Sequence, residues 1–275
     1  DTAGNIGIAA GGTITVANGT TNNAITAAGS GTITLSTSSG GDVLINSSIE
    51  SVTGGIVVAA NRVLTIANGA VIDAGSGTIA LQAQENITLG QVTTTNTGTT
   101  AVTLTSAVGR IVDGGDTGGA DVIAGGRLVI DAVTGVGSGN ALETTVASVD
   151  IDNATSGNIE ISETNAVTVF KAVQGTAGNI SLAAGGTITV DNAGGNAIAA
   201  AGTGTVTLDA NGAASDLLVN DGILSVNGAI TLTADNDVTF LATGDIASTA
   251  GAISVRADAD NGGTSSGALT MVDGT

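Results

Sequence analysis

The chain has 275 residues and carries 24 acidic against 5 basic side chains, a formal net charge of −19. A surface this acidic repels phosphate backbones and anionic lipids, so nucleic-acid binding is excluded. Cys and His are both absent, which also excludes a disulfide scaffold, thiolate metal ligands, and Ser–His or Cys–His catalysis.

In chain order, the predicted elements are short alternating segments. Polar and apolar residues alternate at residues 13–16 and 32–35, and again at 86–89, 158–161 and 205–208. A period of two with β-branched residues predicts strands of about four residues with one buried face. Gly, Asn, Asp or Ser bounds each run, as tight turns require. No 3.6-residue apolar stripe occurs and no apolar run reaches the ~20 residues of a membrane span, so we expect an all-β segment that does not cross a bilayer.

The strands recur with a spacing near 23 residues. In the first half the markers Ile33, Ile56, Ile79 and Val102 are each 23 residues apart. Two further apolar sites follow each marker; they are Leu64 and Ile72 after Ile56, Val167 and Val173 after Ile159, and Ile188 and Ile198 after Ile180. Three short strands per coil predict a triangular parallel β-helix (β-solenoid) of roughly 12 coils, at about 23 residues per coil. Between 108 and 151 the register stays open, because Ile111, Val122, Leu128, Val136, Leu142 and Val149 fit more than one assignment.

A sandwich of hairpins is the competing all-β interpretation. It requires Asn-Gly or Asp-Gly turns between long alternating runs. Such dipeptides occur, for example at 68–69 and 211–212, but the runs beside them are too short for a hairpin core. Apolar residues that recur in register from coil to coil favour the solenoid. The lack of Pro agrees with it, since nearly every backbone N–H is needed in the ladders.

The composition indicates how the interior is filled. Ile, Val and Leu can stack in columns inside a narrow coil, whereas Trp and Tyr, both absent, would overfill it. The two aromatic residues, Phe170 and Phe240, follow alternating strands and are expected in the core or at a coil edge. Gly at corners, as in 10–12 and 184–186, should let neighbouring coils turn without side-chain collision.

A second, longer period also runs through the chain. Residues 3–16 return at 177–190 with two differences, Gly7→Ser and Ile8→Leu, at a shift of 174 positions. We therefore expect residues 1–275 to form a single continuous solenoid segment, with 3–176 one full repeat and 177–275 the start of the next. Because the second repeat is incomplete, the chain is expected to be a window on a longer protein.

Two stretches resemble a known family. The units that read AGNI…AAGGTITV…GTITL, and residues 120–151, are similar to repeats of giant bacterial surface exoproteins of the filamentous-haemagglutinin-like (adhesin) type. The resemblance implies a right-handed parallel β-helix. It also implies export across the outer membrane of a Gram-negative bacterium and an extracellular or cell-surface location.

Candidate sites are limited to carboxylates. The pairs two residues apart, which would share one face of a strand, are Asp150/Asp152, Asp235/Asp237 and Asp258/Asp260. Two carboxylates are the minimum for glycoside hydrolysis, but only Arg256 lies near such a pair and no aromatic groove accompanies them. We therefore assign no catalytic and no cofactor-binding residue, and interpret the pairs as solvated acids.

Calcium and ice are two further candidate ligands. Asp258 and Asp260 are the weak candidates for a metal, calcium; the motif departs from a calcium loop because Gly262 stands at its fifth position. Ice binding by a threonine ladder is disfavoured, since the expected outward column varies: Thr34, Val57, Ala80, Thr103, Glu160, Ser181, Thr207. The scattered bases are expected to be solvated or paired with neighbouring acids.

These observations predict a non-enzymatic shaft or stalk of a large secreted or cell-surface fibrous protein, an adhesin or extracellular filament. Its expected partners are neighbouring repeats of the same chain, copies of itself, and host or cell-surface glycans. The alternative is a carbohydrate-binding or polysaccharide-degrading β-helix with an acidic surface site.

Overall fold

The computed structural model describes all residues except 1–3, 19–22, 116–118, 193–194, 261–266 and 273–275. The described residues form strands and turns without any helix, so among them no helix could cross a membrane. They fall into two compact units, residues 1–133 with 142–146, and residues 134–141 with 147–275. The division between the two units therefore does not coincide with the boundary between the two sequence repeats, which lies between residues 176 and 177.

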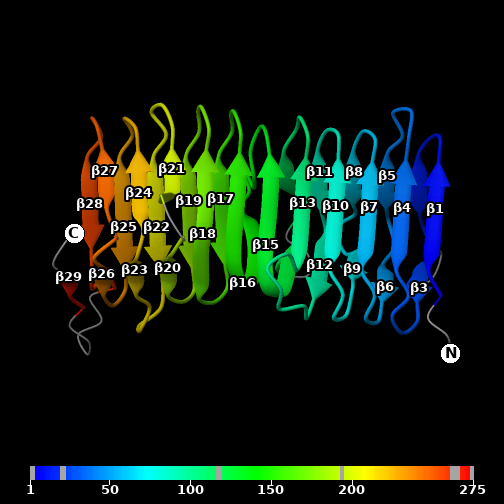
Figure 1. Cartoon of the computed structure of the whole chain (residues 1–275), viewed down its shortest axis with the longest axis horizontal. Coiled ribbons are helices and arrows are strands. Elements are labelled where there is room, and N and C mark those ends of the chain that lie inside the picture. The colour runs from blue at the N-terminus through cyan, green and yellow to red at the C-terminus, as the bar shows by residue number, and fades with distance from the viewer. Residues whose placement is uncertain (1–3, 19–22, 116–118, 193–194, 261–266, 273–275) are drawn as a thin grey trace. The chain divides into compact units, whose positions relative to one another are not determined.

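In the first unit the chain passes through three faces, each a ladder of parallel strands. One face pairs β1, β4, β7, β10, β13 and the second half of β15 in that order (Figure 1). The second pairs β2, β5, β8, β11 and β14, and the third pairs β3, β6, β9, β12 and the first half of β15. The bounds are β1 Ile6–Ala10, β2 Ile14–Val16, β3 Ile25–Ala27, β4 Ile33–Thr37, β5 Val43–Ile45, β6 Ile49–Ser51, β7 Ile56–Ala60, β8 Leu64–Ile66, β9 Val71–Asp73, β10 Ile79–Ala83, β11 Ile87–Leu89, β12 Gln91–Thr94, β13 Val102–Ser106, β14 Ile111–Asp113 and β15 Val122–Ala132.

The second unit has the same three ladders. They are β17–β19–β22–β25–β28, then the start of β18 with β20, β23, β26 and β29, then the ends of β16 and β18 with β21, β24 and β27. The bounds are β16 Leu142–Asn153, β17 Ile159–Glu163, β18 Val167–Gln174, β19 Ile180–Ala184, β20 Ile188–Val190, β21 Asn196–Ala200, β22 Val206–Ala210, β23 Leu217–Val219, β24 Gly222–Ser225, β25 Ile230–Ala234, β26 Val238–Phe240, β27 Ile246–Ser248, β28 Ile253–Arg256 and β29 Leu269–Met271. The fold is thus a parallel β-solenoid of about 11 turns, close to the 12 predicted.

The predicted columns are confirmed by the strand register. Ile33, Ile56, Ile79 and Val102 are direct partners in adjacent coils, and each is fully buried. The predicted outward positions are partners too, Thr34 with Val57, Ala80 and Thr103 in the first unit, and Glu160 with Ser181 and Thr207 in the second. In this column the inward residue is therefore apolar in each coil, while the outward residue next to it varies.

The segment left open by the sequence differs from the rest. β15 and β16 span 11 and 12 residues, and each bends from one face to another instead of ending at a turn. In β15 the bend falls at Gly125 and Gly126, where a Cβ would lie 2.8 Å and 2.3 Å from carbonyl oxygens of the preceding coil. Ile111, Val122, Leu128, Val136, Leu142 and Val149 are all fully buried.

One predicted core position is wrong. Val173 faces outward and is half-buried, while its neighbour Ala172 lies in the core. The cause is a bulge, because Val149 pairs with Val169 but Asp150 pairs with Lys171, so Phe170 is skipped in the ladder. One extra residue exchanges the two faces of a strand. Phe170 is accordingly half-buried at this bulge, and Phe240 alone of the two aromatic residues is a core residue.

Glycine columns form one corner of each unit. A Cβ on Gly77 would lie 2.2 Å from the carbonyl oxygen of Gly54, and one on Gly54 would lie 2.1 Å from that of Gly31. At the predicted corner 184–186, a Cβ on Gly185 would lie 2.4 Å from Thr164 O, whereas at 10–12 the glycines face open space. At Gly54, Gly77 and Gly185 the close approach of successive coils therefore leaves no room for a Cβ.

Buried polar side chains satisfy the backbone beside these corners. The Ser51 hydroxyl donates to Gly31 O at 2.7 Å and accepts from Gly54 N at 3.0 Å. In the second unit the Asn153 amide donates to Gln174 Oε1, and Gln174 Nε2 donates to two backbone carbonyls. These contacts meet the hydrogen-bonding needs of groups that water does not reach.

The two repeats correspond strand by strand. β1, β2, β5, β7 and β8 recur 174 residues later, with identical bounds, as β19, β20, β23, β25 and β26. The shift is 173 between β4 and β22, so positions of the two repeats are compared only where strand bounds or ladder partners agree at 174, as they do for Ile49 with Ile72 and Ile223 with Ile246.

Candidate functional site

The predicted carboxylate pairs do not form a shared site among the described residues. In β16, Asp152 forms an ion pair with Lys171, and Asp150 is the ladder partner of Lys171. Asp235 and Asp237 lie in the turn after β25 rather than on a strand. Asp235 accepts a hydrogen bond from Gly212 N at 2.6 Å, and Asp237 accepts one from Ala268 N at 2.7 Å. Both carboxylates thus cap backbone N–H groups of neighbouring coils.

The weak metal candidates, Asp258 and Asp260, lie in the turn after β28. Asp258 has a left-handed backbone with φ 53° and a buried Oδ1 atom without a hydrogen-bond partner. Arg256 donates to Ala259 O at 2.7 Å, so its guanidinium caps this turn. Asn261 and Gly262, which complete the motif, lie outside the described residues.

The sequence analysis missed an acidic cluster in the first unit. Asp113 ends β14, Asp121 immediately precedes β15, and Glu143 is the second residue of β16. Their carboxylate oxygens lie within 4.8 Å of one another, and in the described part of the chain no other three acids are placed in this way. These are the residues that could hold a metal ion.

The chemistry of the cluster centres on Asp121, whose side chain is 1% exposed. Its carboxylate accepts a hydrogen bond from Glu143 N at 3.1 Å, while Asp113 accepts one from Gly115 N at 2.6 Å. Burial, followed by the charge of Asp113, raises the pKa of Asp121 from 3.8 to about 8. Asp121 is therefore mostly protonated at neutral pH.

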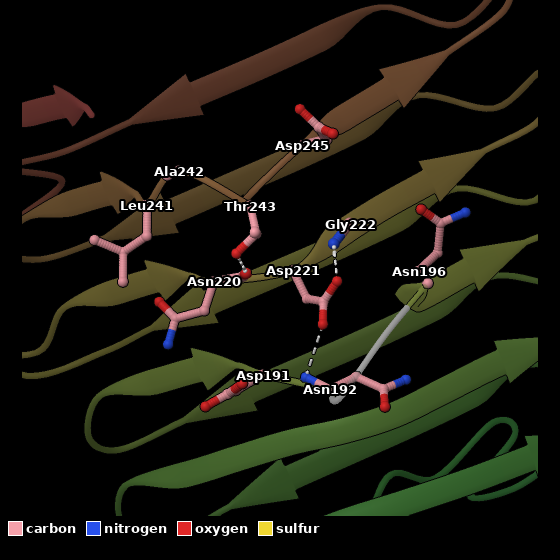
Figure 2. Close-up of a pocket in the computed structure, with 11 residues that line it drawn as sticks. Asp191, Asn192, Asn196, Asn220, Asp221, Gly222, Leu241, Ala242, Thr243 and Asp245 are labelled. Atoms are coloured by element: carbon pink, nitrogen blue, oxygen red, sulfur yellow. Dashed lines mark hydrogen bonds between the residues drawn. The ribbon is translucent and has the colours of Figure 1, made fainter. Parts of the chain in front are cut away.

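The second unit carries an acidic pocket, a cavity of about 670 Å³ at one corner of three successive coils. It follows the ends of β20, β23 and β26, and each of these coils contributes one carboxylate: Asp191, Asp221 and Asp245 (Figure 2). Asn192, Asn196, Asn220 and Thr243 add polar groups, and Leu241, 40% exposed, is the large apolar side chain of the wall. The lining contains no basic side chain.

Hydrogen bonds order part of the acidic pocket. The Asp221 carboxylate accepts from Asn192 N and from Gly222 N, each at 3.1 Å (Figure 2). The Thr243 hydroxyl donates to Asn220 O. The Asn220 Oδ1 atom is buried and accepts no hydrogen bond.

The first repeat shows that this corner does not need its carboxylates. The counterparts of Asp191, Asp221 and Asp245, 174 residues earlier, are Ala17, Ser47 and Val71. The Ser47 hydroxyl accepts from Asn18 N at 2.9 Å, as Asp221 accepts from Asn192 N. A neutral residue therefore performs the capping role of Asp221, and the three charges occur in the second repeat but not in the first.

Sequence reasoning missed the pocket because its acids are not neighbours in the chain. They are separated by 30 and 24 residues and only the coil register brings them to one corner. Aligning the two repeats would have revealed three acids in turns where the first repeat has none.

Comparison of the chain with protein-family models, with curated proteins and with solved structures gives no match.

Proposed function

We propose that this chain is a non-enzymatic structural segment, a shaft or stalk, of a large secreted or cell-surface fibrous repeat protein. The resemblance to filamentous-haemagglutinin-like repeats supports an extracellular place on a Gram-negative bacterium. Neighbouring repeats or copies of the chain are the proposed partners, and no cofactor is required. The observation that carries the proposal is the stacking of successive coils around an inward apolar column. In a longer chain a neighbouring repeat would continue these ladders, and in this segment alone they end in open apolar edges.

The first coil presents one such edge. In the described part of the chain β1 pairs only with β4. Ile8 of β1 is 38% exposed, although its ladder partner Leu35 is fully buried. An inward-facing column thus reaches the surface beside unpaired backbone groups, which form a template for a further strand.

The last coil presents the matching edge. β28 pairs with β25, and no second partner of β28 occurs among the described residues. Ile253 of β28 is 45% exposed, whereas its partner Ile230 is fully buried. The two edges differ, so association of one with the other is heterologous and does not close. Such contacts build linear assemblies.

Sedimentation velocity over a concentration series tests this proposal. We expect the wild-type chain to form oligomers that grow with concentration, and electron microscopy to show growth in length at constant width. The double variant Ile8→Lys/Ile253→Lys should remain monomeric, because charged edges oppose strand addition. A matched control is Val57→Lys, since Val57 is 40% exposed but lies on β7, which pairs along both edges. A wild-type chain that stays monomeric at the highest concentration contradicts the proposal.

A further inference from the structure

We propose that a groove on the first unit binds an uncharged sugar unit of a neutral glycan. This amide groove is bordered by the carboxamides of Asn61, Gln82 and Gln84. Binding there is independent of the proposed shaft function, because it involves four coils of one unit and neither open edge.

The amide groove follows the ends of β4, β7, β10 and β13, which are successive strands of one face (Figure 1). Each of the four coils contributes to its lining. The volume of about 290 Å³ is at the lower end of the roughly 300–1,000 Å³ typical of small-molecule sites. The groove therefore suits one sugar unit of a longer glycan, whose remaining units extend over the surface.

Several polar groups in the groove are free to bind a ligand. In the described part of the chain, the side chains of Gln82, Gln84 and Thr105 have no hydrogen-bond partner. Asn61 accepts a hydrogen bond from Gly40 N at 2.7 Å through Oδ1, which leaves its Nδ2 donors unused. A carboxamide both donates and accepts, as does a sugar hydroxyl, so these groups complement a hydroxyl-rich molecule.

The floor of the groove is apolar. It is formed by Ala59, Ala60 and Ala83, of which Ala60 and Ala83 are buried. An apolar surface with a few placed polar groups is the usual composition of a ligand site. The C–H groups on one side of a sugar ring can pack on these methyl groups while the ring hydroxyls reach the carboxamides.

The lining contains no charged side chain, which selects a neutral ligand. Phosphate, sulfate or uronate groups would find no base in the groove, and the chain's net charge of −19 repels them. An ammonium group would find no carboxylate in the lining to replace its hydration. Hydroxyls carry no charge to desolvate, and the free carboxamides can restore their hydrogen bonds.

The second repeat has charged residues where two of these carboxamides lie in the first. The counterparts of Asn61 and Gln82, 174 residues later, are Asp235 and Arg256. Arg256 donates to Ala259 O at 2.7 Å, so its side chain caps a turn, whereas the Gln82 side chain has no such role among the described residues. The ladder therefore does not require Gln82, and its carboxamide is available to a ligand.

Saturation-transfer difference NMR tests the inference with cellotetraose, mannotetraose and galactotetraose as neutral probes and tetragalacturonate as the anionic one. We expect saturation transfer to at least one neutral tetrasaccharide, and binding of tetragalacturonate at least about tenfold weaker, since the chain repels it. Added salt should change the affinity for the neutral probe by less than about twofold, because no ion pair is involved. The edge variant Ile8→Lys/Ile253→Lys should bind like the wild type, so this result is separate from assembly of the chain.

Variants of the groove locate the binding site. Gln82→Ala/Gln84→Ala should weaken binding by about two- to tenfold for each carboxamide, the scale of a hydrogen bond between neutral groups. Ala59→Leu keeps the carboxamides but fills the floor and should abolish binding; the counterpart of Ala59 is Thr233, so this ladder position accepts a larger side chain. The matched control is Asn227→Ala, which removes an exposed carboxamide of the second unit outside the groove and should bind like the wild type.

Circular dichroism checks that each variant folds. Three results overturn the inference: no saturation transfer to any of the three neutral tetrasaccharides, equal binding of tetragalacturonate, or binding that neither groove variant weakens.

Discussion

Protonation of Asp121 is expected to make the stability of the first unit depend on pH. Burial and the charge of Asp113 raise the pKa of Asp121 to about 8 in the folded chain, from 3.8. Between these values the folded state holds a proton that the unfolded state has released. The free energy of unfolding therefore falls as pH rises, by about 1.4 kcal/mol per pH unit, and levels off above about pH 8. Below about pH 4 both the folded and the unfolded state hold the proton, so ionisation of Asp121 no longer lowers the free energy of unfolding.

The variant Asp121→Asn isolates this contribution. Asn keeps the acceptor for Glu143 N but cannot ionise, so the difference in unfolding free energy between variant and wild type should change with pH. We expect it to shift in favour of the variant by about 3 kcal/mol between pH 5.5 and pH 7.5. Urea unfolding followed by far-ultraviolet circular dichroism at several pH values measures it, and subtraction removes the titration common to both chains.

Asp113→Asn provides a second check on the cause. It removes the neighbouring charge but leaves Asp121 buried. The free energy of unfolding should therefore still fall as pH rises, but it should level off at a lower pH than in the wild type. A variant-minus-wild-type difference that is flat from pH 5.5 to pH 7.5 would refute the reasoning, whatever its absolute size. A uniform loss of stability in Asp121→Asn would instead report packing alone.

Three further changes test the interior and the corners, each measured by thermal unfolding followed by circular dichroism. Gly77→Ala should destabilise the chain by about 2–3 kcal/mol, because its Cβ would lie 2.2 Å from Gly54 O. The control Gly7→Ser should be neutral, because Gly7 faces open space and the second repeat has Ser181 at the corresponding position. Equal effects of the two substitutions would contradict the corner geometry. Phe240→Ala should cost about 3–5 kcal/mol and Phe170→Ala clearly less, since Phe240 is 1% exposed and Phe170 is half-buried at a bulge; the reverse order would show the bulge to be misplaced. Gln174→Ala should cost about 2 kcal/mol, because Thr155 O and Ala177 O lose their side-chain donor and the buried Asn153 amide loses one of its three acceptors. Gln174→Glu keeps an acceptor but removes that donor and buries a charge, so it should not restore stability.

Most of the fold could be predicted because coil stacking leaves a regular trace in the sequence. The column from Ile33 to Val102 repeats every 23 residues, and the ladder register follows it without a shift. The prediction went wrong at Val173, since a bulge that skips Phe170 leaves no local sequence signal. The open register from 108 to 151 has a similar cause, as β15 and β16 cross corners without the turns that mark them elsewhere.

The candidate sites were less predictable than the fold. Pairs such as Asp235/Asp237 are obvious in the sequence, yet their carboxylates serve backbone groups of other coils. Conversely, Asp121 and Glu143 are 22 residues apart and meet only through the unusual path of β15 and β16. Proximity along the chain is thus a poor guide to proximity in a solenoid, where the nearest side chains come from the coil above or below.

The separation of inward and outward positions has an evolutionary consequence. Inward residues such as Leu64 and Val238 are constrained by the coils on either side, but the surface position beside them is not. A duplicated repeat can therefore accumulate new surface chemistry while its ladders stay intact. Ala17, Ser47 and Val71 in one copy, and three aspartates in the other, show such divergence within a single molecule.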